Sequence, residues 1–205
     1  MLTVRFIINY LLWYSVQFQI IFNSQSYFRI ENSSIIYAAD VEGTLTDPEQ
    51  KVCNLSFDSI LKDLDVSHSG VNSSYLYFGM YKTTFSLHIE DMDLYGANYN
   101  HFGAPKFWYI VPPKYVNEME QLCKEKFSKY WDCKGMIRHK NFLISPKVLA
   151  KRNIPCYRYI QEPGDLMIVF PKTFHCGFNA GFNGCEAVNF ATKNYDKICR
   201  KIVVQ

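Results

Sequence analysis

The chain has 205 residues, of which 22 are Lys or Arg and 19 are Asp or Glu, so its formal net charge is +3. This charge is too small for nucleic acid to be the primary partner, and the length is enough for one domain to bury its own core. A hydrophobic share of 48% excludes a disordered chain, and an aromatic share of 17% favours strands.

Two features of the composition bear on the compartment. The seven cysteines are odd in number and lack the spacing of a small disulfide scaffold, which favours buried thiols in a reducing compartment, with one or two free to bind metal. The uncharged run 6–22 reaches only the short edge of a membrane span. Because it contains polar residues, we interpret it as a buried segment or an atypical chain start, with a signal peptide or membrane anchor as the alternative.

The first half of the chain predicts mostly strands. Residues 40–46 are rich in turn formers, and Ser56 then has the place of an N-cap before a short amphipathic helix that includes Leu64. Apolar alternation and turn residues predict strands at residues 75–78, 83–91, 99–102 and 106–111.

The second half adds helices to these strands. Helices are expected to begin at Pro112 and at Ser145, where Pro or an N-cap precedes apolar residues with helical spacing. Residues 157–161 and 166–170 are expected to form a hairpin, and 186–192 a last strand. Short strands with turn signals predict a β-sandwich or barrel-like core.

His88 and Glu90 lie two residues apart in the expected strand 83–91. Alternate residues of a strand point to the same face, so both side chains can bind one ion. His175 is the best candidate for a third ligand, because two His and one carboxylate form the ligand set of non-haem Fe(II) oxygenases. The alternative is a surface His beside a solvated Glu.

Four segments carry a resemblance that reaches beyond these three residues. They are 75–113 (YLYFGMYKTTFSLHIEDMDLYGANYNHFGAPKFWYIVPP), 138–149 (RHKNFLISPKVL), 161–171 (QEPGDLMIVFP) and 175–192 (HCGFNAGFN…NFAT). In these segments the chain resembles the Jumonji-C (JmjC) histone lysine demethylases, and most closely the branch that also has a JmjN domain and acts on histone H3 at lysines nine and thirty-six. This resemblance implies a mainly β fold, a double-stranded β-helix (cupin-like jelly roll) with peripheral helices.

The resemblance divides the chain into three parts. Residues 35–195 are the JmjC catalytic domain, 1–34 are an atypical N-terminal segment with no recognisable JmjN sequence, and 196–205 are a short C-terminal tail. The chain is therefore interpreted as either a divergent member of the family or a fragment of one.

The resemblance also implies roles for individual residues. The iron ligands are His88, Glu90 and His175, and Lys140 lies near the path by which oxygen enters. The residues implied to bind the cosubstrate 2-oxoglutarate are Tyr37, Phe85, Asn98, Lys106 and Trp108. Those implied to contact the methylated lysine are Gly70, Tyr75, Tyr77, Glu90, Ala187, Val188 and Asn189.

Two features depart from this branch of the family. Ala187 and Val188 stand where the branch has Ser and Thr, which puts methyl-state preference and turnover in question. Cys133 and His139 match half of a structural zinc site, but only Cys199 stands for the other half, and tetrahedral zinc needs four ligands. A free thiol at Cys133 is the alternative.

The activity implied by the resemblance is the Fe(II)- and 2-oxoglutarate-dependent removal of methyl groups from histone lysines, with release of formaldehyde. The implied partners are the methylated histone H3 tail and chromatin in the nucleus, without sequence-specific nucleic-acid contact and without a membrane. Two alternatives stay open. One is a degenerate module that binds a histone tail or another partner without turnover, and the other is a hydroxylase of protein side chains.

Overall fold

The computed structural model describes residues 36–46, 59–127, 140, 142–193 and 195. The uncharged run 6–22 and the expected zinc ligands Cys133, His139 and Cys199 lie outside these residues, so their interpretations stay predictions. Within the described ranges, no helix combines the length and the apolar character needed to cross a membrane.

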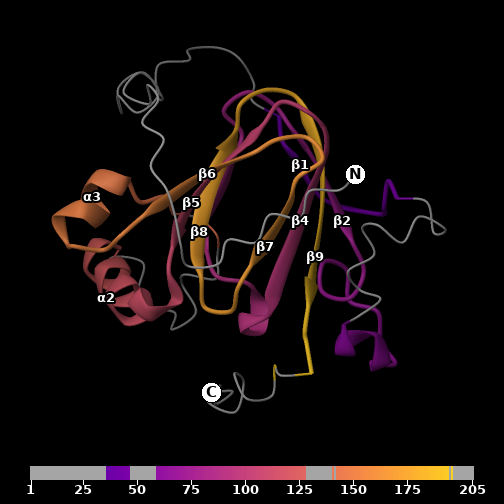
Figure 1. The fold of residues 1–205 in the computed structure, drawn as a ribbon, viewed down its shortest axis with the longest axis horizontal. Helices are drawn as coiled ribbons and strands as arrows, with labels where there is room; N and C mark the ends of the chain where they lie inside the picture. The colour runs from indigo at the N-terminus through magenta and orange to yellow at the C-terminus, as the bar shows by residue number, and fades with distance from the viewer. Residues whose placement is uncertain (1–35, 47–58, 128–139, 141, 194, 196–205) are drawn as a thin grey trace.

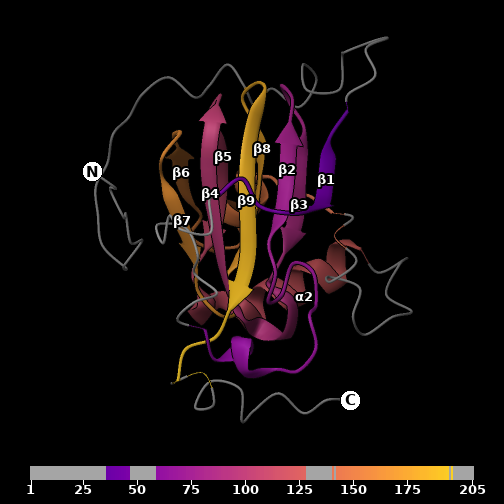
Figure 2. The same ribbon diagram turned by 90° about the vertical axis from the view of Figure 1, so that its right-hand side faces the viewer.

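Two antiparallel sheets face each other and form the body of the domain (Figure 1). The five-stranded sheet, seen from its outer face in Figure 2, has the order β1-β2-β9-β4-β7, and the four-stranded sheet has the order β3-β8-β5-β6. The expected jelly-roll fold with peripheral helices is confirmed. The strands are β1 (Ala38–Glu42), β2 (Tyr75–Gly79), β3 (Thr84–His88), β4 (Tyr95–Gly103), β5 (Lys106–Val111), β6 (Tyr157–Gln161), β7 (Leu166–Val169), β8 (Phe174–Asn179) and β9 (Asn183–Phe190).

Two of these strands have no counterpart among the expected ones. β1 occupies part of the segment 40–46, which was expected to be a turn. It is an irregular edge strand whose register shifts between Ala38 and Val41. β8 is buried along its whole length, so its sequence lacks the alternation of polar and apolar residues that marks a half-buried strand.

The expected hairpin of residues 157–161 with 166–170 is wrong. β6 pairs with β5 in the four-stranded sheet, whereas β7 pairs with β4 in the five-stranded sheet. The turn between them has Gly164 at φ +88° and carries the chain from one sheet to the other. It is fastened to β4, because Gly164 N donates to Asn100 O at 2.7 Å and Asn100 N donates to Asp165 O at 3.2 Å.

Helices form where the sequence predicts them in the second half. The 3-10 turn η4 (Pro113–Tyr115) leads into α2 (Val116–Lys126), and Ser145 caps α3 (Pro146–Lys151) by accepting a hydrogen bond from Lys147 N at 3.3 Å. A helix was expected to follow Ser56, and the described residues of that segment form a shorter 3-10 helix. Ser59 caps the 3-10 helix η2 (Ile60–Asp63) and also accepts from Ala191 N at 3.0 Å.

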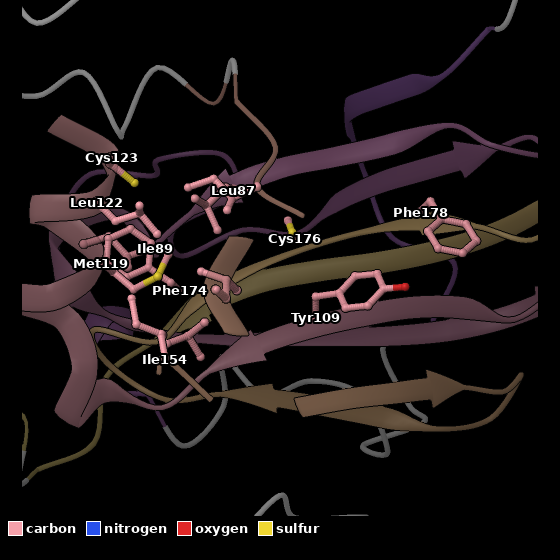
Figure 3. Close-up of a cluster of buried hydrophobic side chains, with 13 residues drawn as sticks. Leu87, Ile89, Tyr109, Met119, Leu122, Cys123, Ile154, Phe174, Cys176 and Phe178 are labelled. Carbon is pink, nitrogen blue, oxygen red and sulfur yellow. The ribbon is translucent and has the colours of Figure 1, made fainter. Parts of the chain in front are cut away.

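A hydrophobic core lies between the helices and the outer face of the four-stranded sheet (Figure 3). α2 contributes Met119, Leu122 and Cys123, which are at most 2% exposed. They belong to one cluster with Tyr109 of β5 and Phe174 of β8. The helices therefore cover this outer face, while a smaller cluster with Ile110, Met167 and Val169 packs between the two sheets beside Trp108.

The cysteines in the described part of the chain are buried or partly buried free thiols: Cys123, Cys156, Cys176 and Cys185. Burial raises the pKa of Cys123 and of Cys176 to about 12. Such thiols stay protonated at neutral pH and pack as small apolar side chains. For these four residues the structure agrees with the interpretation as buried thiols.

The core predicts the effect of truncating α2. Leu122→Ala should lower the free energy of unfolding by about 2–5 kcal/mol, because it leaves a cavity against the sheet. Lys124→Ala, on the exposed side of the same helix, is the matched control and should change it by no more than about 0.5 kcal/mol. Urea unfolding followed by circular dichroism measures both, and equal midpoints for the two variants would contradict the packing of α2.

Candidate functional site

A cavity of about 300 Å³ opens between the two sheets. Every residue that the sequence assigned to iron, cosubstrate or lysine binding, and that the structure describes, lines this cavity. Lys140 contributes as an exposed residue. The full set is Tyr37, Gly70, Tyr75, Tyr77, Phe85, His88, Glu90, Asn98, Lys106, Trp108, Lys140, His175, Ala187, Val188 and Asn189.

His88 and His175 meet across the strand pair β3–β8, with their ring centroids 4.2 Å apart. Phe85 lies opposite Gly177, and His88 lies opposite His175. Between these two pairs the chain advances by three residues along β3 but by only two along β8. This irregularity is a β-bulge. It turns both Phe85 and His88 toward the cavity, although regular alternation would place them on opposite faces.

Glu90 joins the two histidines although β3 ends before it. The strand expected to reach residue 91 is wrong at this end, because Met92 and Asp93 have φ of 51° and 50° and turn the chain within the 3-10 helix η3 (Asp91–Asp93). Glu90 itself keeps an extended backbone, and its Oε1 lies 3.4 Å from Nε2 of His175. The pair His88 and Glu90 thus meets as expected, but only the first of them belongs to the strand.

Two neighbours fix the carboxylate of Glu90. Asn189 Nδ2 donates to Glu90 Oε2 at 2.9 Å and to Tyr95 O at 3.1 Å. Gly96 faces the other oxygen, and a Cβ atom built at Gly96 would lie only 2.3 Å from Glu90 Oε1. A residue without a side chain at this place in β4 is therefore what makes room for the carboxylate.

Both imidazoles are oriented by backbone carbonyls. His88 Nδ1 lies 2.7 Å from Ser86 O, and His175 Nδ1 lies 3.0 Å from Thr173 O, so each Nδ1 carries the proton and each Nε2 keeps a free lone pair. Burial, together with the neighbouring His175, lowers the pKa of His88 well below its usual value, and burial also lowers the pKa of His175.

The three side chains suit a divalent metal ion. Their ligand atoms all lie within 4.8 Å of one another, and they offer two neutral imidazoles and one carboxylate oxygen. This is the donor set of the two-His-one-carboxylate facial triad, which leaves positions open for further ligands on Fe(II). The residues present therefore fit the iron that the sequence predicts.

Lys106 brings a buried positive charge into the cavity. The residue is 3% exposed, and its Nζ donates to Asn179 Oδ1 at 3.1 Å and to the Tyr37 hydroxyl at 3.4 Å. The ring of Phe85 lies beneath it, with Nζ 4.9 Å from the centroid. Both hydrogen-bond partners are neutral, and burying an ammonium group is costly without an anion. A ligand carboxylate would be a strong third partner.

Asn98 and Trp108 complete this side of the cavity. Asn98 is 8% exposed, and its Oδ1 has no hydrogen-bond partner within the described ranges. Trp108 lies against both Phe85 and His175, with ring centroids 4.7 Å and 5.7 Å away. Its indole N–H donates to Gln161 Oε1 at 2.9 Å. The cavity of the buried ammonium therefore also has an aromatic wall and, among the described residues, an amide oxygen without a hydrogen-bond partner.

Tyrosines from β2 line the part of the cavity expected to receive the methylated lysine. The rings of Tyr75 and Tyr77 are 6.5 Å apart and perpendicular. The Tyr77 hydroxyl donates to Asp40 Oδ1 at 2.8 Å. Burial and the bond to Asp40 raise the pKa of Tyr77 far above its usual range, so the phenol stays protonated.

The two residues that depart from the expected Ser and Thr differ in their surroundings. Ala187 lies in β9 between its cross-strand partners Tyr75 and Asn98. Val188 borders the cavity as well, but its side chain packs in a hydrophobic cluster with Ala97. A methyl group at Ala187 thus stands between the tyrosines and the amide of Asn98.

Asp40, Gln161 and Asn179 have no expected role, yet their side chains hydrogen-bond to residues of the site. Asn179 lies four residues after His175 and therefore on the same face of β8, a signal that the sequence contains. Gln161 and Asp40 give no comparable signal, because their contacts with Trp108 and Tyr77 depend on how the strands pair.

Comparison with known proteins gives a family. A family model described as "JmjC domain, hydroxylase" matches residues 75–190. "Probable lysine-specific demethylase 4F" of Homo sapiens is 49% identical over 166 residues, which cover 78% of this chain. "Lysine-specific demethylase 4D" of Rattus norvegicus is 48% identical over 168 residues, or 79% of the chain. "Lysine-specific demethylase 4B" of Mus musculus is 44% identical over 186 residues, or 84%.

The alignments cover much less of the relatives than of this chain. They span 26%, 33% and 17% of the three curated proteins, in the order above. The chain therefore matches a third or less of each relative's length.

The site predicts selective loss of metal binding. Wild-type protein reconstituted with Fe(II), or with Ni(II) as an inert substitute, should bind one ion, whereas His88→Ala and His175→Ala should lose it because each removes one of three ligands. His101→Ala is the control, since His101 pairs with Glu186 away from the triad. Elemental analysis after gel filtration measures the stoichiometry, and full occupancy in both triad variants would overturn the assignment.

Proposed function

The chain belongs to the family of JmjC domain hydroxylases, and on this premise we propose that it is an Fe(II)- and 2-oxoglutarate-dependent demethylase of histone lysines. One observation carries the proposal: the metal-ligand triad shares its cavity with Lys106, a buried ammonium group whose hydrogen-bond partners are both neutral. A cavity that only held a peptide would need neither feature, whereas a metal-chelating keto acid with a second carboxylate uses both.

The chain's own residues bind and orient the reactants. When bound, iron, 2-oxoglutarate and dioxygen would supply the oxidation of an N-methyl group to a hydroxymethyl group, with 2-oxoglutarate converted to succinate and CO2, and the hydroxymethyl group would then leave as formaldehyde. His88, Glu90 and His175 hold the metal through three protein ligands. Lys106 and Tyr37 donate hydrogen bonds to the distal carboxylate of the cosubstrate, and the Asn98 amide adds a polar contact. The rings of Phe85 and Trp108 exclude water from that end.

The other part of the cavity receives the methylated lysine. The faces of Tyr75 and Tyr77 attract its methylammonium group, because an aromatic ring stabilises a cation placed over it. Asp40 strengthens this attraction, since its carboxylate accepts the hydrogen bond from Tyr77 and places a negative charge close to the ring. Ala187 leaves one wall of this part without a hydroxyl group.

The substrate that fits this proposal is the methylated tail of histone H3, which places the protein on chromatin in the nucleus. The names of all three relatives are those of lysine-specific demethylases. Direct recognition of DNA sequence has no support in a formal net charge of only +3.

A module that binds a methylated tail without turnover is a second candidate, and Ala187 is the observation that favours it. A hydroxyl group expected beside the methyl groups is missing there, while the tyrosines that hold the cation are present. The two candidates differ in whether formaldehyde forms.

The proposal predicts measurable turnover. With Fe(II), 2-oxoglutarate and trimethylated histone H3 peptides, the wild-type chain should release formaldehyde and succinate in equal amounts, and His88→Ala should fall to background. His101→Ala should keep wild-type activity. Formaldehyde dehydrogenase coupling measures the formaldehyde, and mass spectrometry measures the succinate and the loss of methyl groups from the peptide. Tight peptide binding without any formaldehyde would replace the demethylase by the binding module.

The buried ammonium predicts a specific loss of cosubstrate affinity. Lys106→Met should weaken binding of 2-oxoglutarate to the Ni(II)-loaded protein roughly 10- to 100-fold, because a charge-assisted hydrogen bond to a carboxylate contributes about 1.5–3 kcal/mol. Metal affinity should stay unchanged. Lys147→Met, an exposed lysine of α3, is the control. Isothermal titration calorimetry measures both, and an unchanged dissociation constant for Lys106→Met would remove this residue from the cosubstrate site.

A further inference from the structure

We infer that Gln161 is a positioning residue for the part of the cavity that is proposed to bind the cosubstrate. Its side-chain amide holds both Trp108 and Asn98 in position, and because the amide is neutral it adds no negative charge beside Lys106. This inference rests on the proposed function, because it names what orders the residues that would bind 2-oxoglutarate. Gln161 itself does not line the cavity, so its effect on the cosubstrate is exerted through its neighbours.

The side-chain amide of Gln161 is fully buried, and both its oxygen and its nitrogen form hydrogen bonds. The residue is 0% exposed. Its Oε1 accepts from the indole N–H of Trp108 at 2.9 Å, and its Nε2 donates to Asn98 O at 2.8 Å and to Asp165 O at 3.1 Å. Each of these partners accepts only one orientation of the amide, since an indole can only donate and a carbonyl can only accept. The side chain is therefore locked in place by its own hydrogen bonds.

These bonds connect the two sheets. Trp108 and Gln161 belong to the four-stranded sheet, through β5 and β6, whereas Asn98 belongs to β4 of the five-stranded sheet. Gln161 is also the last residue of β6, directly before the turn that carries the chain across to β7. Asp165 holds this turn, because its Oδ2 accepts from Glu162 N at 3.1 Å and from the Tyr159 hydroxyl at 3.0 Å. The Gln161 amide therefore lies where hydrogen bonds hold the turn in place and join the two sheets.

The consequence for the site follows from what Trp108 and Asn98 touch. Trp108 is stacked near His175, with ring centroids 5.7 Å apart and an interplanar angle of 28°, and it packs against Phe85. The side chain of Asn98 reaches the cavity, and its Oδ1 has no hydrogen-bond partner in the part of the chain that the structure describes. Because Gln161 holds the indole of one and the backbone of the other, it sets the distance between the aromatic wall and the polar group that faces it.

The neutrality of Gln161 matters because of its neighbour. Lys106 and Gln161 are direct cross-strand partners in the β5–β6 pair, so their side chains lie on the same face of the sheet. A carboxylate at this position would pair with the buried ammonium and compete with the carboxylate of the cosubstrate. An amide of the same size satisfies Trp108 and leaves the charge of Lys106 to the ligand.

The test uses two variants of the full chain and one matched control. Gln161→Met removes all three hydrogen bonds, and Gln161→Glu keeps an acceptor for Trp108 but places a carboxyl group beside Lys106. Leu122→Ala destabilises the fold from the opposite face of the four-stranded sheet, without touching the cavity. For each we measure the Ni(II) affinity, the dissociation constant of 2-oxoglutarate and the indole N–H resonance of Trp108, which is one of three tryptophans and is assigned by its loss in Trp108→Phe.

The expected results separate a positioning role from a structural one. Gln161→Met should shift the Trp108 indole resonance and weaken 2-oxoglutarate binding roughly tenfold, the effect of losing about one net hydrogen bond, with Ni(II) affinity unchanged. Gln161→Glu should weaken 2-oxoglutarate binding at least as much, with a smaller shift of the indole resonance. Leu122→Ala should change neither, although it lowers the melting temperature.

The opposite results are equally clear. If both Gln161 variants bind 2-oxoglutarate as tightly as the wild type, or if Leu122→Ala weakens binding as much as they do, Gln161 is a structural residue and the inference is wrong while the proposed function stands. If the wild-type protein loaded with Ni(II) binds no 2-oxoglutarate, the proposed function fails and the inference fails with it.

Discussion

The pairing of β3 with β8 around a bulge is the constraint on which the rest of the site depends. Three residue steps on β3 face two on β8, and this places His88 opposite His175 and keeps Phe85 on the same side. With regular pairing, Phe85 and His88 would point to opposite faces of the sheet. The bulge therefore lets one short strand supply both a candidate metal ligand and the ring of Phe85 beneath the buried ammonium.

A second constraint is that the two faces of the four-stranded sheet have different roles. Its outer face is covered by α2 and α3 and forms the hydrophobic core shown in Figure 3. The inner face can then hold polar groups whose burial costs free energy, as long as each finds a partner. Lys106, Gln161 and Asn179 each have a hydrogen-bond partner on a neighbouring strand. Lys106 of β5 donates to Asn179 of β8, and Gln161 of β6 accepts from Trp108 of β5.

The two sheets contribute different parts of the proposed chemistry. Both histidines, Lys106 and Trp108 come from the four-stranded sheet, whereas Tyr75, Tyr77, Ala187 and Asn98 come from the five-stranded one. Asn98, a proposed cosubstrate residue, is the direct cross-strand partner of Ala187, so the two proposed parts of the cavity meet on this sheet. The methyl group of Ala187 therefore bears on both parts, while both candidate histidine ligands belong to the other sheet.

The sequence by itself determined the family, the fold class and the identity of the three candidate metal ligands, because long motifs are local properties of the chain. It also located α2 and α3, whose caps lie next to them in sequence. The hairpin of 157–161 with 166–170 was wrong because a turn shows that the chain reverses, not which sheet each strand joins.

Tertiary structure alone decided the bulge before His88 and the contacts of Gln161 and Asp40. Each of these depends on pairing between segments that are distant in sequence. The hydrogen-bond partners that select a register or an amide orientation exist only once the two sheets have come together.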